Sequence, residues 1–105
     1  MQTTPYTIIY ITCANEAEAE LLAESLVAKN LVACANYFPI KSVYRWGGKV
    51  EKAEEYALVC KTRKDKFEAV EARVKELHSY EVPAILAFEI MNGNDEFLKW
   101  IDKNT

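Results

Sequence analysis

The stretch LVACANYFPIKSVYRWGG, residues 31–48, decides how this chain folds, because it is one long extended arm that ends in a glycine pair. Its β-branched and aromatic residues favour a strand through most of its length. Gly47 and Gly48 predict a hairpin turn. The return arm passes through the charged residues 49–55 and becomes the strand Tyr56–Thr62. We therefore predict a hairpin that is long for one small domain.

The outer half of this hairpin would overhang the rest of the fold. Pro39 lacks a backbone N–H and so indicates a bulge or an edge position in the first arm. Towards the turn, the aromatic residues Tyr44 and Trp46 would lie exposed on strands with free edges. Because free strand edges readily pair with other chains, we infer that the hairpin pairs with another subunit.

The segments that flank the hairpin supply a strand and two helices. Tyr6–Cys13 is rich in β-branched and aromatic residues and largely apolar on both faces, so it is predicted to be a central strand covered on both sides. Asn15 is predicted to cap a helix that runs to about Lys29, and Asp65 to cap a second helix that runs to about Leu77. Each helix has an apolar stripe at helical spacing, formed by Ala19, Leu22, Ala23 and Leu26 in the first and by Phe67, Val70, Val74 and Leu77 in the second.

The rest of the chain is predicted to form a fourth strand, Ala84–Met91, and a short helix from Asp95 to about Asp102. The order β-α-β-β-α-β plus a terminal helix is typical of an α+β protein with a ferredoxin-like arrangement. That arrangement packs both long helices on one face of a four-stranded antiparallel sheet and leaves the other face bare. The second face still carries apolar residues, which again favours burial against a partner.

Length and composition bound the class of protein. A chain of 105 residues, 50% of them hydrophobic, is expected to form a single domain over residues 1–105. The net charge of -3 argues against a nucleic-acid binder, and the third strand lacks the aromatic signature of RNA-recognition domains. No apolar run reaches the roughly 18–20 residues of a membrane span, and the N-terminus lacks a signal-peptide pattern. We therefore expect no membrane partner and a cytosolic location.

The stretch HSYEVP, residues 78–83, follows the second helix and contains the only histidine. Pro83 biases Val82 away from helix, so the helix ends before this point. On spacing alone, the favoured role of His78 is to cap the helix C-terminus by bonding free carbonyl groups. The catalytic alternative is a cysteine–histidine pair or a pair with Glu81, but no orienting third group or oxyanion-hole motif accompanies either. We predict that the protein is not an enzyme.

Three widely spaced cysteines offer soft ligands for a metal. Their odd number in a chain without an export signal indicates reduced thiols, and thiolates combined with imidazole suit copper and zinc. Cys13 ends the first strand, and whether it is a core residue or a ligand stays open. Cys34 and Cys60 are more often small hydrophobic side chains, and Cys60 is the best core candidate. One acidic face of the first helix is interpreted as solvated rather than metal-binding; it consists of Glu16, Glu20 and Glu24.

Several collinear motifs resemble those of the CutA divalent-cation tolerance proteins. The matching stretches are LVACAN at 31–36, SVYRWGGK at 42–49, KT at 61–62, HSYEVP at 78–83 and FLKW at 97–100. With the first strand they span nearly the whole chain. The resemblance implies a ferredoxin-like subunit, a tight homotrimer held by the long hairpin, and a cytoplasmic location.

The same resemblance implies a role in tolerance of divalent metals, with copper(II) or another divalent cation as the ligand. Carried over by position, the implied metal ligands are Cys13, His78 and Cys34. This chain has Leu77 where some members have a second histidine, and Ser79 where proline is common. The first departure removes one ligand, and the second loosens the turn.

The fold also resembles that of PII-type signalling trimers, whose subunit clefts bind small molecules. By that analogy an inter-subunit cleft is lined by Trp46, Lys61, His78, Tyr80 and Glu81. The alternative to a metal-binding trimer is therefore a signalling or scaffold trimer whose cleft binds a small anion or a partner protein. This alternative predicts that Lys61 and Tyr80 point into the cleft.

Overall fold

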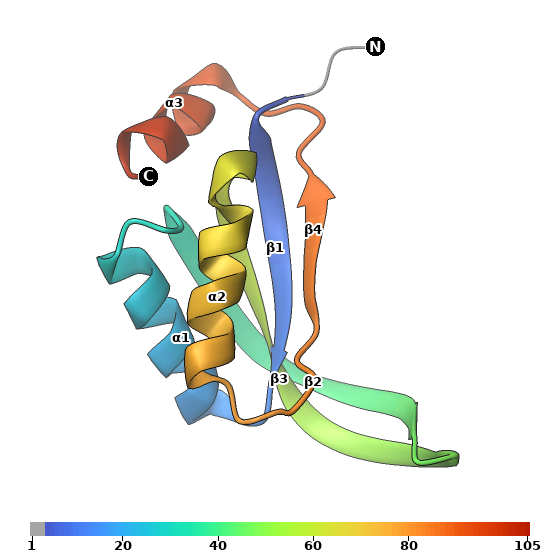
Figure 1. Cartoon of the computed structure of the whole chain (residues 1–105). Coiled ribbons are helices and arrows are strands. Elements are labelled where there is room, and N and C mark those ends of the chain that lie inside the picture. Colours follow the sequence, from blue (N-terminus) through green and yellow to red (C-terminus); the bar gives the residue numbers. More distant parts are fainter. Residues whose placement is uncertain (1–3) are drawn as a thin grey trace.

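The computed structural model describes residues 4–105 and contains four strands and three α-helices within that range (Figure 1). Their bounds, in chain order, are β1 Tyr6–Cys13, α1 Glu16–Ala28, β2 Cys34–Trp46, β3 Lys49–Arg63, α2 Phe67–Leu77, β4 Ile85–Glu89 and α3 Asp95–Lys103. A 3-10 turn, Lys64–Lys66, joins β3 to α2. The predicted β-α-β-β-α-β order with a terminal helix is confirmed.

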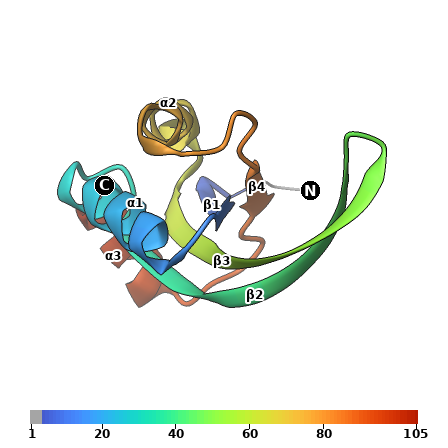
Figure 2. The same ribbon diagram turned by 90° about the horizontal axis from the view of Figure 1, so that it is seen from below.

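The strands form one antiparallel sheet in the order β2-β3-β1-β4, so β1 is central as predicted. Helices α1 and α2 lie side by side over one face of this sheet (Figures 1 and 2). The core forms where their apolar stripes meet the inward side chains of β1 and β3; its fully buried members include Ile9, Ile11, Leu22, Leu26, Leu58, Val70 and Val74. The fold is the predicted ferredoxin-like α+β arrangement.

The β2–β3 hairpin extends beyond the other strands. β3 pairs with β1 only over Tyr56–Arg63, whereas residues 49–55 pair with β2 alone. Figure 2 shows this outer half projecting away from the body of the protein. Gly47 and Gly48 form the turn, with φ angles of 58° and 77° in the left-handed region that favours glycine. The predicted overhang is confirmed.

The sheet face opposite α1 and α2 is only partly covered in the single chain. Helix α3 lies over it near the start of β1, where Tyr6 bonds Asp102 and Lys61 lies beside Phe97, and the part towards β4 is bare. Along β1, Ile9 and Ile11 are fully buried, whereas the alternate residue Tyr10 is only partly buried. Its partner on the edge strand β4 is Leu86, which is more than half exposed, as is Phe88 two residues further on. The prediction that β1 is covered on both sides holds within one chain only near the start of β1, because α3 reaches no further along the second face.

The helix starts agree with the sequence in one case and not in the other. Asn15 caps α1, since its Oδ1 accepts a hydrogen bond from the Glu18 N–H at 2.9 Å. The predicted Asp65 cap of α2 is wrong, because α2 begins after the 3-10 turn and Asp65 instead forms an ion pair with Arg63 at 3.5 Å. None of the helices within residues 4–105 is long and apolar enough to cross a membrane.

The second and fourth strands are shorter than predicted. β2 begins at Cys34 rather than Leu31, because the N–H groups of Leu31 and Val32 donate to the Leu26 carbonyl at the end of α1. β4 covers only Ile85–Glu89 of the predicted stretch. These differences move strand ends but leave the order and pairing of the strands as predicted.

Candidate metal centre

His78 is positioned by the end of α2. Its backbone N–H donates to the Val74 carbonyl at 2.8 Å, and its φ and ψ angles of -75° and 140° turn the chain out of the helix. The side chain points towards the end of β1 and is fully buried, with 0% of it exposed. The only histidine therefore lies inside the protein rather than on the helix surface.

Both nitrogens of the His78 ring are hydrogen-bonded. Nε2 lies 2.7 Å from the Thr12 carbonyl oxygen, and Nδ1 lies 3.0 Å from the Tyr80 nitrogen, whose N–H donates to it. Because a carbonyl oxygen only accepts, the proton of the neutral ring is assigned to Nε2. The predicted bonding of this ring to its own helix end is wrong, since the ring bonds a carbonyl of β1 instead.

Cys13 and Glu18 form a cluster with His78. Cys13 is the last residue of β1 and is buried, and Glu18 lies in the first turn of α1. One ligand atom from each residue lies within 4.8 Å of the other two, and Glu18 Oε1 is 3.8 Å from His78 Nδ1. Three atoms bound to one metal at about 2.0–2.3 Å in a tetrahedral or trigonal arrangement lie about 3.3–4.0 Å apart, so the donor atoms must approach one another by up to about 1 Å to bind one ion. Thiolate, imidazole and carboxylate form a donor set that suits a divalent transition metal.

Glu18 is the member of this cluster that the sequence analysis did not single out. Its Oε2 accepts from the Ala14 N–H at 2.7 Å, one residue before the Asn15 N–H that a capping-box glutamate bonds, and its Oε1 accepts from the Ser79 N–H at 2.7 Å. A side chain in the first turn of a helix points back towards the helix start. Because Glu18 follows Cys13 by only five residues, the sequence could have indicated that its side chain points back towards the end of β1.

The cluster shifts the pKa values of Cys13 and Glu18 in opposite directions. Burial, reinforced by the nearby carboxylates of Glu18 and Glu55, raises the pKa of the Cys13 thiol to about 12. Burial also raises the pKa of Glu18, but hydrogen bonds from Ala14 and Ser79 and the proximity of His78 outweigh it, so the net shift is downward. At neutral pH a metal must therefore displace the thiol proton of Cys13.

The other two cysteines lie away from this cluster. Cys34 begins β2 and pairs with Lys61, whose partner on β1 is Ile8, five residues before Cys13. At roughly 3.3 Å per residue, Cys34 and Cys13 are about 16 Å apart along the sheet. The structure therefore does not bring Cys34 to the cluster within one chain. Cys60 is fully buried in the core, which confirms its prediction as a core residue.

A cleft of about 630 Å³ lies between the outer half of the hairpin and the loop after α2. Three of the five residues predicted to line a cleft contribute to its walls, namely Trp46, Tyr80 and Glu81, whereas His78 and Lys61 do not. The other lining residues are Thr12, Ser42, Val43, Tyr44, Glu55, Ser79, Val82 and Ala84. Lys61 lies elsewhere, with its ammonium 5.9 Å from the centre of the Phe97 ring on α3.

The walls of this cleft are acidic and aromatic. Glu55 is only 8% exposed, and its Oε2 accepts from the Tyr80 hydroxyl at 2.6 Å. Burial, followed by this hydrogen bond, raises the pKa of Tyr80, so the proton stays on the hydroxyl. No lysine or arginine is among the described residues that line the cleft, so its charge favours positively charged ligands.

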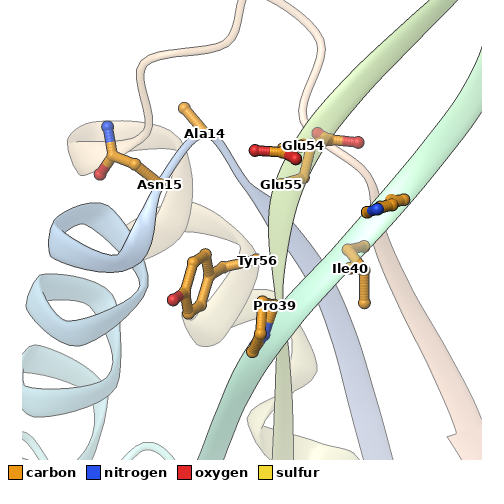
Figure 3. A pocket seen from close by; sticks show the side chains of 8 residues that line it. Ala14, Asn15, Pro39, Ile40, Glu54, Glu55 and Tyr56 are labelled. Atoms are coloured by element: carbon orange, nitrogen blue, oxygen red, sulfur yellow. The ribbon is translucent and has the colours of Figure 1, made fainter.

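A second hollow, of about 550 Å³, lies between the start of α1 and the arms of the hairpin (Figure 3). Its lining residues are Ala14, Asn15, Pro39, Ile40, Lys41, Glu54, Glu55 and Tyr56. In Figure 3 the Tyr56 ring lies towards α1, where its hydroxyl donates to Glu16 Oε2 at 3.0 Å. Glu55 borders both hollows, at the point where the hairpin leaves the sheet.

The fold and the cluster together define a small ferredoxin-like α+β protein with a candidate metal centre. The sequence model of the CutA1 divalent ion tolerance protein family matches residues 7–104, and the chain belongs to this family. It is 49% identical over 98 residues to the divalent-cation tolerance protein CutA of Archaeoglobus fulgidus, which covers 93% of this chain and 96% of that protein.

Solved structures of relatives have the same fold. The periplasmic divalent cation tolerance protein CutA from Archaeoglobus fulgidus matches with a TM-score of 0.93 and 48% identity, over 94% of this chain and 97% of that chain. The divalent cation tolerance protein from Thermus thermophilus matches with a TM-score of 0.93 and 40% identity, over 95% of this chain and 98% of that chain. The chloroplastic protein CutA of Arabidopsis thaliana is 38% identical over 105 residues, 99% of this chain, but the match spans only 58% of its own length. The names that refer to cations describe tolerance rather than a chemical reaction.

Proposed function

We propose that this protein binds a divalent metal, copper(II) foremost, in the tolerance of or response to such ions. Cys13 and His78 are the proposed ligands, and Glu18 is the third. The approach of their donor atoms to within 4.8 Å of one another carries this proposal. Copper(II) is favoured because it has the highest affinity in the series of divalent first-row metals. The protein is proposed to act by binding and not by catalysis.

Cys34 is a weaker candidate ligand, proposed from its position in the family motif. Within one chain it lies about 16 Å from Cys13 along the sheet, so it would have to reach the ion from another subunit. Cys34 therefore distinguishes a site built within one chain from a site shared between chains.

Titration of the reduced protein with zinc(II), a divalent ion that does not oxidise thiols, tests the proposed centre, and copper(II) is then titrated with the free thiols counted before and after. Cys13→Ser and His78→Ala should each weaken binding by more than the roughly 10–100-fold that loss of an outer-shell partner costs. Glu18→Gln should weaken it less, because the amide keeps one oxygen donor. Cys34→Ser decides between the two kinds of site: unchanged affinity indicates a site within one chain, and weakened affinity indicates a site shared between chains. Unchanged affinity in both Cys13→Ser and His78→Ala would contradict the proposal.

We also propose that the chain, as one domain over residues 1–105, assembles into a homotrimer. Three features favour association with further copies: the overhanging hairpin, the free edge of β4 and the part of the second sheet face that α3 leaves bare, where Leu86 and Phe88 are exposed. Light scattering should give three times the chain mass of 12.0 kDa. A mass of one chain at micromolar concentration would contradict the trimer.

The proposed location is the cytoplasm. Relatives differ in this respect, since the Archaeoglobus fulgidus protein is described as periplasmic and the Arabidopsis thaliana protein as chloroplastic. Fractionation of the source cells followed by immunodetection decides the question, with recovery in the cytoplasmic fraction as the expected result.

The cleft favours a second candidate function, a signalling or scaffold trimer that binds a small molecule. Its walls combine three aromatic side chains, those of Tyr44, Trp46 and Tyr80, with the carboxylates of Glu55 and Glu81. Aromatic faces and carboxylates together attract ammonium groups. A positively charged organic molecule therefore fits this cleft better than the small anion that the sequence suggests.

Calorimetric titration with choline tests this second function. Binding should be lost in Trp46→Ala and weakened in Glu81→Gln, because each removes one class of contact from the cleft. Trp100→Ala is the matched control, since Trp100 is also exposed but lies on α3. Absence of choline binding, or equal loss in the Trp100 variant, would count against the cleft.

A further inference from the structure

We propose that a cation bound at the Cys13–Glu18–His78 cluster releases the Tyr80 backbone from His78 and thereby loosens the loop of residues 79–82. This inference rests on the proposed metal site. All four residues of the loop line the cleft, so the release would alter one wall of that cleft. Metal binding and the shape of the cleft are then coupled through Tyr80.

The His78 ring has no lone pair to spare. A neutral imidazole offers one N–H and one lone pair. Here the N–H on Nε2 is directed at the Thr12 carbonyl at 2.7 Å, and the lone pair on Nδ1 accepts from the Tyr80 N–H at 3.0 Å. A metal needs a lone pair on the neutral ring, so it can bind only by displacing one of these partners.

Either choice of nitrogen breaks the bond to Tyr80. A cation on Nδ1 takes the lone pair that the Tyr80 N–H now uses. A cation on Nε2 requires the ring proton to move to Nδ1, where it would face the Tyr80 N–H, donor against donor. The bond between Tyr80 and His78 is therefore incompatible with a metal on the neutral ring in both cases.

The loop is held by the same side chains that would bind the metal. The Ser79 N–H donates to Glu18 Oε1 at 2.7 Å, and the rings of His78 and Tyr80 pack with their centroids 4.8 Å apart. A carboxylate oxygen has two lone pairs, so Glu18 can keep Ser79 and also bind a cation. The imidazole cannot do both, so the release begins at Tyr80.

Tyr80 carries this change to the hairpin. Its hydroxyl donates to Glu55 at 2.6 Å, and Glu55 is a buried residue at the point where β3 leaves the sheet. Linkage is reciprocal: if a bound cation weakens a contact that holds Tyr80 in place, that contact lowers the affinity for the cation by the same factor. The Tyr80–Glu55 bond is thus expected to lower the affinity of the cluster for metal.

Amide hydrogen exchange with and without zinc(II) tests the release on the unmodified protein. At saturating zinc, the Tyr80 amide should exchange at least about ten-fold faster, because it has lost its acceptor. The His78 amide donates to Val74 within the helix end and should keep its rate, which makes it the internal control. The zinc content of the same sample is measured in parallel.

The outcomes separate the release from the metal site itself. Zinc bound at the cluster together with faster Tyr80 exchange supports the release. Zinc bound at the cluster with an unchanged Tyr80 rate overturns the release and leaves the proposed metal site intact. Failure of the cluster to bind zinc overturns the proposed site, and the release with it.

The variant Tyr80→Phe provides a second test. It removes the bond to Glu55 and keeps the ring, so zinc affinity should rise roughly three- to ten-fold. The amide at position 80 should also exchange faster in the zinc-free variant, because the loop has lost its bond to Glu55. Tyr6→Phe is the matched control, because it removes a tyrosine–carboxylate bond, to Asp102, from the opposite end of β1. Unchanged or weaker zinc binding in Tyr80→Phe would overturn the release.

Discussion

The two ends of β1 carry the same kind of interaction in opposite environments. At the start of the strand the Tyr6 hydroxyl donates to Asp102 Oδ2 at 2.7 Å, and near its end the Tyr80 hydroxyl donates to Glu55 Oε2 at 2.6 Å. Asp102 is exposed on α3, whereas Glu55 is buried. The bond chemistry is the same, so the two pairs differ in burial. We expect the buried pair to couple a movement of the loop after α2 to β3, and the exposed pair to have no such effect.

The neighbours of the two pairs differ in the same way. Near the start of β1, Lys64 and Glu89 form an ion pair of 2.8 Å whose side chains are 38% and 42% exposed, and water can replace either partner. Near its end, His78 is fully buried and Cys13 is buried beside it. A group that loses its partner there is shielded from bulk water and is rehydrated less readily than one at the start of β1. We therefore expect large effects of substitution at the end of β1 and small effects at its start.

The largest effect is expected for His78→Ala. The substitution leaves the Thr12 carbonyl and the Tyr80 N–H without their partner and opens a cavity, so the free energy of unfolding should fall by about 2–4 kcal/mol. Urea denaturation of the metal-free protein measures it. A loss below about 1 kcal/mol would show that water fills the space and satisfies both groups.

The two tyrosine–carboxylate bonds give a direct comparison of intermediate size. Tyr80→Phe strips a buried carboxylate of its partner and should lower the free energy of unfolding by about 1.5–3 kcal/mol. Tyr6→Phe should lower it by less than about 1 kcal/mol, because the exposed Asp102 is rehydrated. Equal losses in the same denaturation experiment would refute the idea that burial separates the two ends.

The smallest effect is expected in the contribution of the Glu18 and Glu89 carboxyls to the stability of the protein at low pH. The folded protein lowers the pKa of both carboxyls: at Glu18 the hydrogen bonds from Ala14 and Ser79 outweigh the upward effect of burial, and at Glu89 the bond from Lys64 dominates. A lowered folded pKa stabilises the protein above the unfolded value of 4.5, and this contribution disappears as the pH falls through the folded pKa. Glu18→Gln and Glu89→Gln should each flatten the loss of stability below about pH 5.

The effects of substituting Glu18 and Glu89 should depend differently on salt concentration. The effect of Glu89→Gln should shrink at high ionic strength, because an exposed ion pair is screened. The effect of Glu18→Gln should persist, because backbone hydrogen bonds in a shielded site are screened much less. Thermal unfolding at pH 3–6, with and without about 1 M sodium chloride, measures both, and identical salt dependence would contradict the comparison.

Most of the fold could be predicted because its signals are local. The glycine pair at 47–48 and the strands on either side of it predict the hairpin, and their length predicts the overhang. The bare part of the second sheet face followed from the order of elements. The prediction of Asp65 as a cap was wrong because the spacing of a capping residue from the helix does not reveal the 3-10 turn that precedes α2.

The site was predictable only in part, because strand register and side-chain direction are not readable from spacing. Cys13 and His78 were assigned by family resemblance, and the structure places them in one cluster. Lys61 pairs with Ile8, towards the start of β1, so it lies away from the cleft to which sequence assigned it. Glu18 was overlooked because a glutamate three residues after a capping Asn15 is already explained by the capping-box pattern, although its Oε1 lies 3.8 Å from His78 Nδ1.

X-ray absorption at the zinc edge of the reduced, zinc-loaded protein tests most directly whether Cys13 and His78 bind one ion. Zinc(II) stands in for copper(II) because it does not oxidise the thiol. We predict one sulfur ligand at about 2.3 Å and one imidazole nitrogen at about 2.0 Å, with the sulfur lost in Cys13→Ser and the imidazole in His78→Ala. A shell of oxygen and nitrogen atoms without sulfur, unchanged in both variants, would contradict the proposed metal centre.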